Sequence, residues 1–171
     1  MTNQLSQSVA EKLRDFRLPL FHEIPDVGLY LEQTTKYLSG YLDPVLPGCM
    51  TASMISNYVK KGLISSPVKK QYSREQIAYL FFIAVAKNVL SLDALHSFIR
   101  LQQRTHPAAK AYNYFAGEFQ NLLLFTFDLK PTLEVVGEEE SSVEKRLLYS
   151  CIASVVQKIY LEIWLQSLDE A

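Results

Sequence analysis

Apolar residues recur at helical spacing along most of this chain, with charged and small polar residues between them. Residues 1–16 show a short amphipathic pattern. A second helical pattern runs from about 27 to 42, where Pro44 stops it. Pro19 and Pro25 lie between the two patterns and indicate a loop. The N-terminal part is therefore predicted to be two helices joined by a loop.

Capping residues define the next two helices. Thr51 is a suitable N-cap and Gly62 a suitable residue just past a C-terminus, which predicts a helix over 51–61. Ser73 and Gln76 have the spacing of a capping box, so another helix should begin there. Its body, IAYLFFIAVA, is apolar on every side and is expected in the core.

The segment between these helices, residues 64–72, is too short for a further helix, and Pro67 also disfavours one. We expect an extended excursion or a tight hairpin that presents Lys69 and Lys70. This short wing is the one place where the pattern leaves room for β structure.

Three more helical patterns fill the C-terminal part. Ser91 caps the first, the second spans about 108–129, and Ser141 with Glu144 opens a long final helix. Thirteen of the eighteen residues from Leu147 to Trp164 are apolar. This helix therefore either packs within the monomer or forms a dimer interface. The whole pattern predicts an all-α protein with at most a minimal β wing.

The overall composition is that of an ordinary globular protein, but the charged residues are unevenly distributed along the chain. The 171 residues are 49% hydrophobic and 20% charged, with a formal net charge of −1, as in ordinary globular proteins. Between Met54 and Arg74 there are five basic residues and no acidic one, whereas eight acidic residues face three basic ones from Pro131 onward. The basic segment thus lacks the carboxylates that would repel an anion.

Motifs for enzyme chemistry are missing from the sequence: it has no glycine-rich phosphate loop, no H-E-x-x-H and no G-x-S-x-G. The histidines and the two cysteines lack metal-ligand spacing, so we expect no metal, no cofactor and no enzymatic activity. Unpaired cysteines and an N-terminus without an apolar signal core favour a cytoplasmic protein. The longest unbroken apolar run, Ile77–Ala86, is too short to cross a membrane, so no membrane partner is expected.

The helix predicted over 51–61 has a polar face that suits DNA. Its residues are serines, an asparagine suited to an adenine edge, and a lysine, while the basic residues that follow are suited to phosphates. The candidate DNA-binding residues are Ser53, Ser56, Asn57, Lys60, Lys61, Lys69, Lys70, Gln71 and Arg74.

The stretch SMISNYVKKGLI…KQYSREQIAYLFFI…VLSLDAL resembles the DNA-binding head of MerR-type regulators over about 45 residues. The matching residues are Ile55, Tyr58, Gly62, Leu63, Tyr72, Ser73, Ile77, Leu80, Leu90, Leu92 and Leu95. Residues 17–100 are also similar to a bacterial family catalogued as domain of unknown function 1836. The resemblance implies a winged helix-turn-helix head and leaves the ligand and the DNA target unassigned.

These observations divide the chain into an N-terminal tail or short helix (1–16), a MerR-like helix-turn-helix domain (17–104) and a C-terminal helical region (105–171). The expected function is that of a transcriptional regulator that binds double-stranded DNA. It is expected to act as a homodimer, with the two copies joined through their C-terminal helices. The alternative is a non-enzymatic protein-interaction adaptor that keeps the winged-helix shape. Ser56, where the family places an arginine, and the short wing favour the adaptor.

Aromatic residues are concentrated in the helix predicted over 108–129. They either pack in the core or line a pocket for an unknown small-molecule effector. The candidate pocket residues are Tyr112, Phe115 and Phe119.

Overall fold

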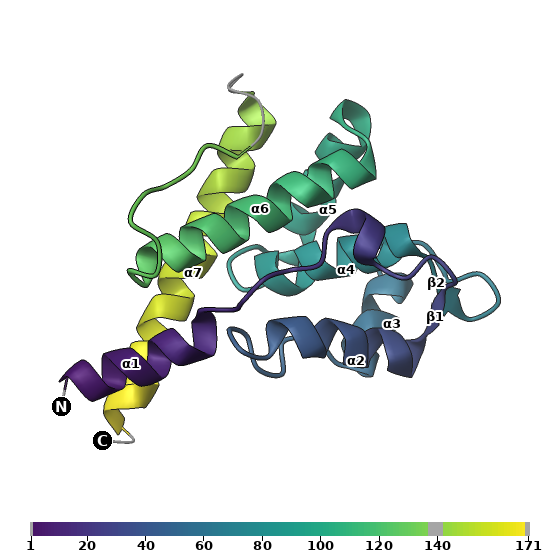
Figure 1. Ribbon diagram of the computed structural model, residues 1–171. Coiled ribbons are helices and arrows are strands. Elements are labelled where there is room, and N and C mark those ends of the chain that lie inside the picture. The colour runs from purple at the N-terminus through teal and green to yellow at the C-terminus, as the bar shows by residue number, and fades with distance from the viewer. Residues whose placement is uncertain (1, 137–141, 170–171) are drawn as a thin grey trace.

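The computed structural model describes residues 2–136 and 142–169, and these residues form a mostly helical protein (Figure 1). In chain order the elements are α1 (Thr2–Leu13), the 3-10 helix η1 (Phe21–Glu23), β1 (Leu29–Tyr30), α2 (Leu31–Leu42), α3 (Ala52–Lys60), β2 (Gln71–Tyr72), α4 (Arg74–Ala86), α5 (Leu92–Thr105), α6 (Ala108–Thr126) and α7 (Val143–Asp169). The predicted mostly helical class is confirmed. Within the described residues, β1 and β2 form the single small sheet.

Helix starts follow the capping chemistry that the sequence predicts. The side chains of Thr51, Ser73 and Ser91 each accept a hydrogen bond of 3.2 Å from the backbone N–H three residues on. Ser142 caps α7 in the same way, also at 3.2 Å. Ser141, which the sequence predicts to open this helix, lies outside the described residues.

The predicted start of the second helix at about 27 is wrong, because α2 begins at Leu31. The preceding residues form β1, which pairs antiparallel with β2 and sets Leu29 opposite Tyr72. Gly28 has a φ of +79°, and a Cβ placed there would lie 3.0 Å from the Cβ of Gln71. Only glycine tolerates both this backbone conformation and this close approach. The strand therefore depends on a partner more than forty residues away.

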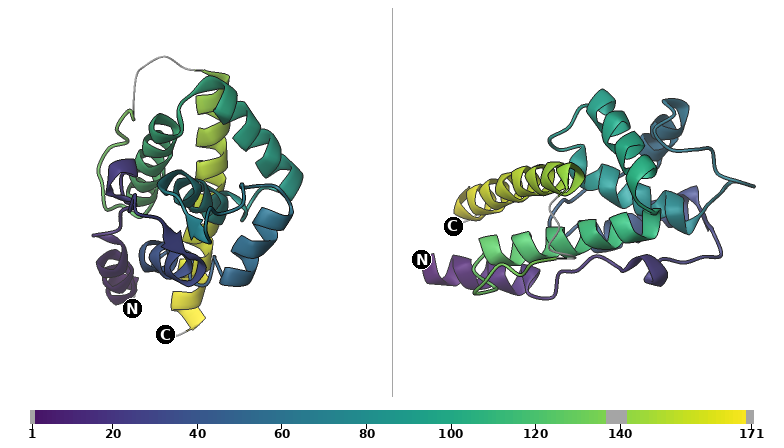
Figure 2. Two further views of the ribbon diagram at one scale, coloured as in Figure 1. Left: turned by 90° about the vertical axis from the view of Figure 1, so that its right-hand side faces the viewer. Right: turned by 90° about the horizontal axis from the view of Figure 1, so that it is seen from above.

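Helix α4 lies at the centre of one continuous hydrophobic core. Its residues from Ile77 to Ala86 are buried, apart from the half-buried Tyr79, as the uniformly apolar sequence predicts. It packs against α2 on the N-terminal side of the molecule and against α6 and α7 on the C-terminal side. Figure 2 shows α7 running through nearly the full height of the molecule beside these helices. The regions on both sides of residue 104 thus share one core.

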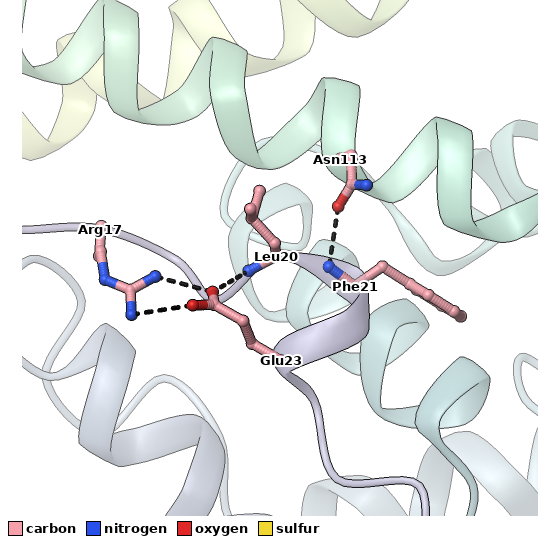
Figure 3. Close-up of polar contacts among 5 residues, drawn as sticks. All are labelled: Arg17, Leu20, Phe21, Glu23 and Asn113. Carbon is pink, nitrogen blue, oxygen red and sulfur yellow. Dashed lines mark hydrogen bonds and ion pairs between the residues drawn. The ribbon is translucent and has the colours of Figure 1, made fainter.

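The segment of residues 17–26, which includes η1 and is here called the strap, ties the N-terminal region to α6. The carboxylate of Glu23 accepts hydrogen bonds from the Arg17 guanidinium (2.8 Å) and from the Leu20 N–H (2.7 Å) (Figure 3). The N–H of Phe21 donates to Oδ1 of Asn113 on α6, at 2.8 Å. The ion pair lowers the pKa of the Glu23 carboxyl. These bonds hold the strap across the helices in an ordered position.

Helix α7 has one buried face and one exposed apolar face. Leu147, Leu161, Leu165 and Leu168 are between 46% and 61% exposed and lie on the side opposite the buried Ile152. By length and composition α7 is also apolar enough to cross a membrane, with a mean hydropathy of 1.2 in its most apolar window and 28% of that window buried. The core helix of a soluble protein meets the same criterion, and the buried face of α7 belongs to the core.

Candidate nucleic-acid interface

The outer face of α3 is polar and free of carboxylates. Ile55 and Tyr58 are buried beneath it, and this amphipathic division orients the helix. Ser53, Asn57 and Lys60 are exposed, and Ser56 is half-buried beside them. The four residues that the sequence assigns to one face of this helix therefore do share its outer face.

The end of α3 is fixed by its glycine. Gly62 has a φ of +70°, its N–H donates to the Val59 carbonyl (3.0 Å), and the Leu63 N–H donates to the Tyr58 carbonyl (2.9 Å). These two bonds define a Schellman motif, as the position of Gly62 predicts. The His96 ring of α5 lies 3.2 Å from the Lys61 carbonyl, which ties α5 to the same turn. Both exposed lysines at this end, Lys60 and Lys61, thus project from a rigid terminus.

The wing (residues 64–72) turns at its lysine pair. Val68 and Gln71 form an antiparallel bridge, and the Gln71 N–H donates to the Val68 carbonyl at 2.9 Å. The residues between them, Lys69 and Lys70, have φ values of +51° and +63°. Two successive positive φ values are the mark of a type I′ hairpin turn, for which Asn-Gly is the usual sequence. The turn holds both exposed lysines at the tip of the wing.

Gln76 anchors the wing, a role that sequence reasoning missed. Its Oε1 accepts from the Ser73 N–H (2.9 Å) in the predicted capping box. Its Nε2 donates to the carbonyl (2.9 Å) and hydroxyl (3.0 Å) of Ser65 and to the Ser66 carbonyl (3.3 Å). One amide therefore starts α4 and holds the near end of the wing. The S-x-x-Q spacing signals the first role only.

We predict that Gln76→Glu frees the wing while leaving the start of α4 intact. A glutamate keeps the Oε1 acceptor for Ser73 but replaces the donor with an oxygen that faces the Ser65 carbonyl. Amide hydrogen exchange over residues 64–72 should become faster, with a loss of stability of about 1–3 kcal/mol. Glu75→Gln, a change at the neighbouring residue, serves as the control and should leave the exchange unchanged.

Arg74 and Gln71 are placed differently from the other candidate residues. The Arg74 guanidinium donates to the Ile24 carbonyl (2.7 Å) and the His22 carbonyl (3.3 Å) of the strap, and it lies 5.8 Å from the Phe21 ring centre. Gln71 pairs through its backbone with both Val68 and β1 and is half-buried against Gly28. Both residues hold the base of the wing against the strap and β1.

A groove of about 1160 Å³ lies between the wing and α5. Ser65 and Lys69 contribute to one wall, and His96 and Arg100 of α5 contribute to the other. Arg100 is exposed, as is Arg104 one turn further along. Sequence reasoning did not include α5 in the interface, although the i, i+4 spacing of these two arginines on a predicted helix is a usable signal. Asp26 and Glu75 also line the groove, so it is not uniformly basic.

The three candidate effector residues on α6 separate in the structure. Tyr112 and Phe115 line an apolar cavity between α4, α5, α6 and α7. Phe119 is not among the residues that line it; its ring is fully buried and contacts Phe16 edge-on, with 5.7 Å between centroids. The buried hydroxyl of Tyr112 has no hydrogen-bond partner among the described residues.

The two cysteines and the other potential ligands form no reactive centre in the part of the chain that the structure describes. Cys49 and Cys151 are free and buried, and burial raises the pKa of each thiol to about 11. Both thiols are therefore protonated at neutral pH. Among the described residues no group of three His, Cys, Asp or Glu side chains is arranged to hold a metal ion.

Comparison with known protein families identifies the chain. The family model described as "Domain of unknown function (DUF1836)" matches residues 19–115, which is more than half of the 171 residues. The chain belongs to this family. The matched range starts in the strap, includes α2 to α5 and ends in α6, so it contains the whole candidate interface. No curated protein and no solved structure matches the chain.

Proposed function

We propose that the protein is a DNA-binding transcriptional regulator whose head is a MerR-like winged helix-turn-helix. The observation that carries the proposal is the arrangement of α3 and the wing: an acid-free outer helix face is followed by a hairpin turn with two lysines at its tip. A helix of this kind fits the major groove, and the hairpin then reaches the adjacent phosphates.

The proposed contacts divide between base edges and phosphates. Ser53, Ser56, Asn57 and Lys60 on the outer face of α3 meet the base edges, with Asn57 suited to adenine. Lys61, Lys69 and Lys70 meet phosphates. Arg74 holds the strap through its bonds to Ile24 and His22, and these bonds make it a supporting residue rather than a direct contact.

The exposed face of α7 supports a homodimer. Its leucines are too exposed to contribute fully to the monomer core, and a second copy of the same face would cover them. A dimer also presents two heads to two half-sites, which a single head with few contacts needs for useful affinity. A cytoplasmic location fits a protein of this function.

The proposal is tested by selecting DNA from a random pool with the purified full-length protein. Enrichment of an inverted repeat whose half-sites are one helical turn apart would support both DNA binding and the dimer. A pool that remains random after several rounds would reject sequence-specific reading by α3. Absence of any DNA binding at low salt, where phosphate contacts are strongest, would reject the proposal as a whole.

The groove beside the wing favours a second candidate, a protein-interaction adaptor that uses the winged-helix shape. Its walls combine basic, acidic and apolar side chains, which is more typical of a peptide-binding surface than of a phosphate channel. Capture of a partner protein would favour the adaptor over the regulator if two conditions hold. Nuclease treatment should leave the binding unchanged, and shortening the wing should abolish it.

A further inference from the structure

Helix α5 carries a second acid-free basic surface, separate from α3 and the wing. From Ala94 to Gly117 the chain has no acidic residue, and its basic residues include Arg100 and Arg104 of α5. Leu95 and Ile99 on the opposite face of the helix are buried in the core, and this amphipathic division turns both arginines toward solvent.

The two arginines line a depression on the outer side of α5. Ser97 and Gln103 are the other residues that line it, so none of the four is acidic. Arg100 and Arg104 are separated by one helical turn, about 6 Å along the helix axis. A guanidinium is planar, weakly hydrated and able to form paired hydrogen bonds with phosphate oxygens. The depression therefore suits a chain of phosphates.

Both guanidinium groups are available to a ligand. Neither forms an ion pair with a carboxylate in the part of the chain that the structure describes. Nε of Arg100 donates to the His96 carbonyl of the same helix at 3.4 Å, and this bond does not use the two terminal nitrogens. Asp26 and Glu75 line the wider groove beside the wing, but they do not line the depression. The charge of the arginines is thus not neutralised by a bonded acid.

The depression continues the surface that α3 presents. The His96 ring lies 3.2 Å from the Lys61 carbonyl, so α5 abuts the C-terminal turn of α3. The left view of Figure 2 shows the two helices following one another along one side of the molecule. His96, Arg100 and Arg104 share one face of α5 at intervals of one turn, and this row extends for about 12 Å. A nucleic-acid strand held at Lys61 can therefore continue along α5.

Arg100 also faces the wing across the groove between them. It contributes to the wall formed by α5, while Lys69 contributes to the wall formed by the wing. Gly62 and Leu63, which follow the end of α3, line the same groove. Positively charged side chains thus border the C-terminal end of α3 on two sides.

We propose that α5 is a second phosphate-binding surface of the head, where Arg100 and Arg104 contact the backbone of the DNA that α3 reads. The duplex then lies across α3 with the wing on one side and α5 on the other. This inference rests on the proposed function and deepens it. Phosphate contacts fix the position of a protein on the duplex and carry no sequence information, so α5 adds affinity and orientation rather than base recognition.

The test compares the full-length protein with Arg100→Gln/Arg104→Gln by fluorescence anisotropy over a range of salt concentrations. A duplex enriched in the selection and a random-sequence duplex of equal length serve as probes. The variant should bind both duplexes roughly tenfold more weakly, and the slope of log affinity against log salt should become less negative by about 1.8, or 0.9 for each of two phosphates. The ratio of the two affinities should stay unchanged, because α3 is intact.

Two further variants separate phosphate contact from other effects. Arg100→Lys/Arg104→Lys keeps the charge and should restore most of the slope. Lys12→Gln/Arg14→Gln removes two exposed positive charges at the other end of the molecule and should leave the slope unchanged. Thermal unfolding followed by circular dichroism should be the same for all the variants, because every substituted side chain is exposed.

The possible results distinguish this inference from the proposed function. If the unmodified protein binds DNA and Arg100→Gln/Arg104→Gln leaves the slope unchanged, the role of α5 is overturned and DNA binding by α3 stands. An equal change of slope in the Lys12 and Arg14 variant also overturns it, since the effect is then one of net charge. A changed ratio of affinities would contradict a pure phosphate contact. Failure of the unmodified protein to bind any duplex at low salt would reject both proposals.

Discussion

Replacing Lys60 and Lys61 together with alanine is expected to weaken DNA binding strongly and to flatten its dependence on salt. Both lysines are exposed at the rigid end of α3, where the Schellman turn at Gly62 fixes their direction. Each neutralised phosphate releases condensed cations, so the slope of log affinity against log salt should become less negative by about 0.9 for each phosphate that the variant no longer neutralises. Fluorescence anisotropy of a selected DNA duplex over a range of salt concentrations measures both quantities.

The control for this variant removes two positive charges at the other end of the molecule. Lys12 on α1 and Arg14 just after it are exposed, and α1 lies far from the sheet and the wing in Figure 1. Lys12→Ala/Arg14→Ala changes the net charge by the same amount and should leave the slope unchanged. If both double variants change the slope equally, the effect is one of net charge, and α3 is not the contact surface.

Replacing Phe119 with alanine should cost about 3–5 kcal/mol of stability, the usual range for removing a buried phenylalanine. Its side chain is fully buried, packs edge-on against Phe16, and lies 6.2 Å from the Phe115 ring centre. Phe115 in turn contacts Phe82 of α4. Because these rings join α6 to the central helix, the loss should extend to the whole molecule. Urea unfolding followed by far-UV circular dichroism measures it.

The single tryptophan, Trp164 on α7, provides a second probe of the same transition. Its fluorescence and the circular dichroism should shift to lower urea together, since both regions share one core. Phe125→Ala on the same helix as Phe119 is the control: Phe125 is 38% exposed, and its loss should cost about 1 kcal/mol or less. Separate transitions for the two probes in the unmodified protein would contradict the shared core.

Local chemistry explains which parts of the fold could be predicted from the sequence. Thr51, Ser73 and Ser91 cap helices because a hydroxyl can reach the N–H groups of the next turn wherever the chain is placed. Gly62 ends α3 for an equally local reason. The outer face of α3 follows from helical periodicity alone, and so four of the candidate residues could be assigned to a common face correctly.

The parts that could not be predicted depend on contacts between distant segments. Leu29 fits the helical spacing of the apolar residues that follow it, but pairing with Gln71–Tyr72 makes Leu29 and Tyr30 a strand. Arg74 belongs to a basic stretch, yet its guanidinium bonds to the Ile24 carbonyl, fifty residues earlier in the chain. Phe119 shares an aromatic pattern with Tyr112 and Phe115, but its ring packs against Phe16, more than a hundred residues earlier in the chain, and does not line the cavity.

The lysine pair at the tip of the wing provides positive charge but lowers the stability of the turn that carries it. Left-handed backbone at a residue with a side chain costs about 1 kcal/mol or more, and Asn-Gly would occupy the same turn at lower cost. The bonds from Gln76 and the pairing with β1 supply the stability that the turn itself lacks. A sequence optimised for thermal stability alone would lose these lysines. Their presence indicates that at the tip of the wing the positive charge on the surface is kept at a cost in folding stability.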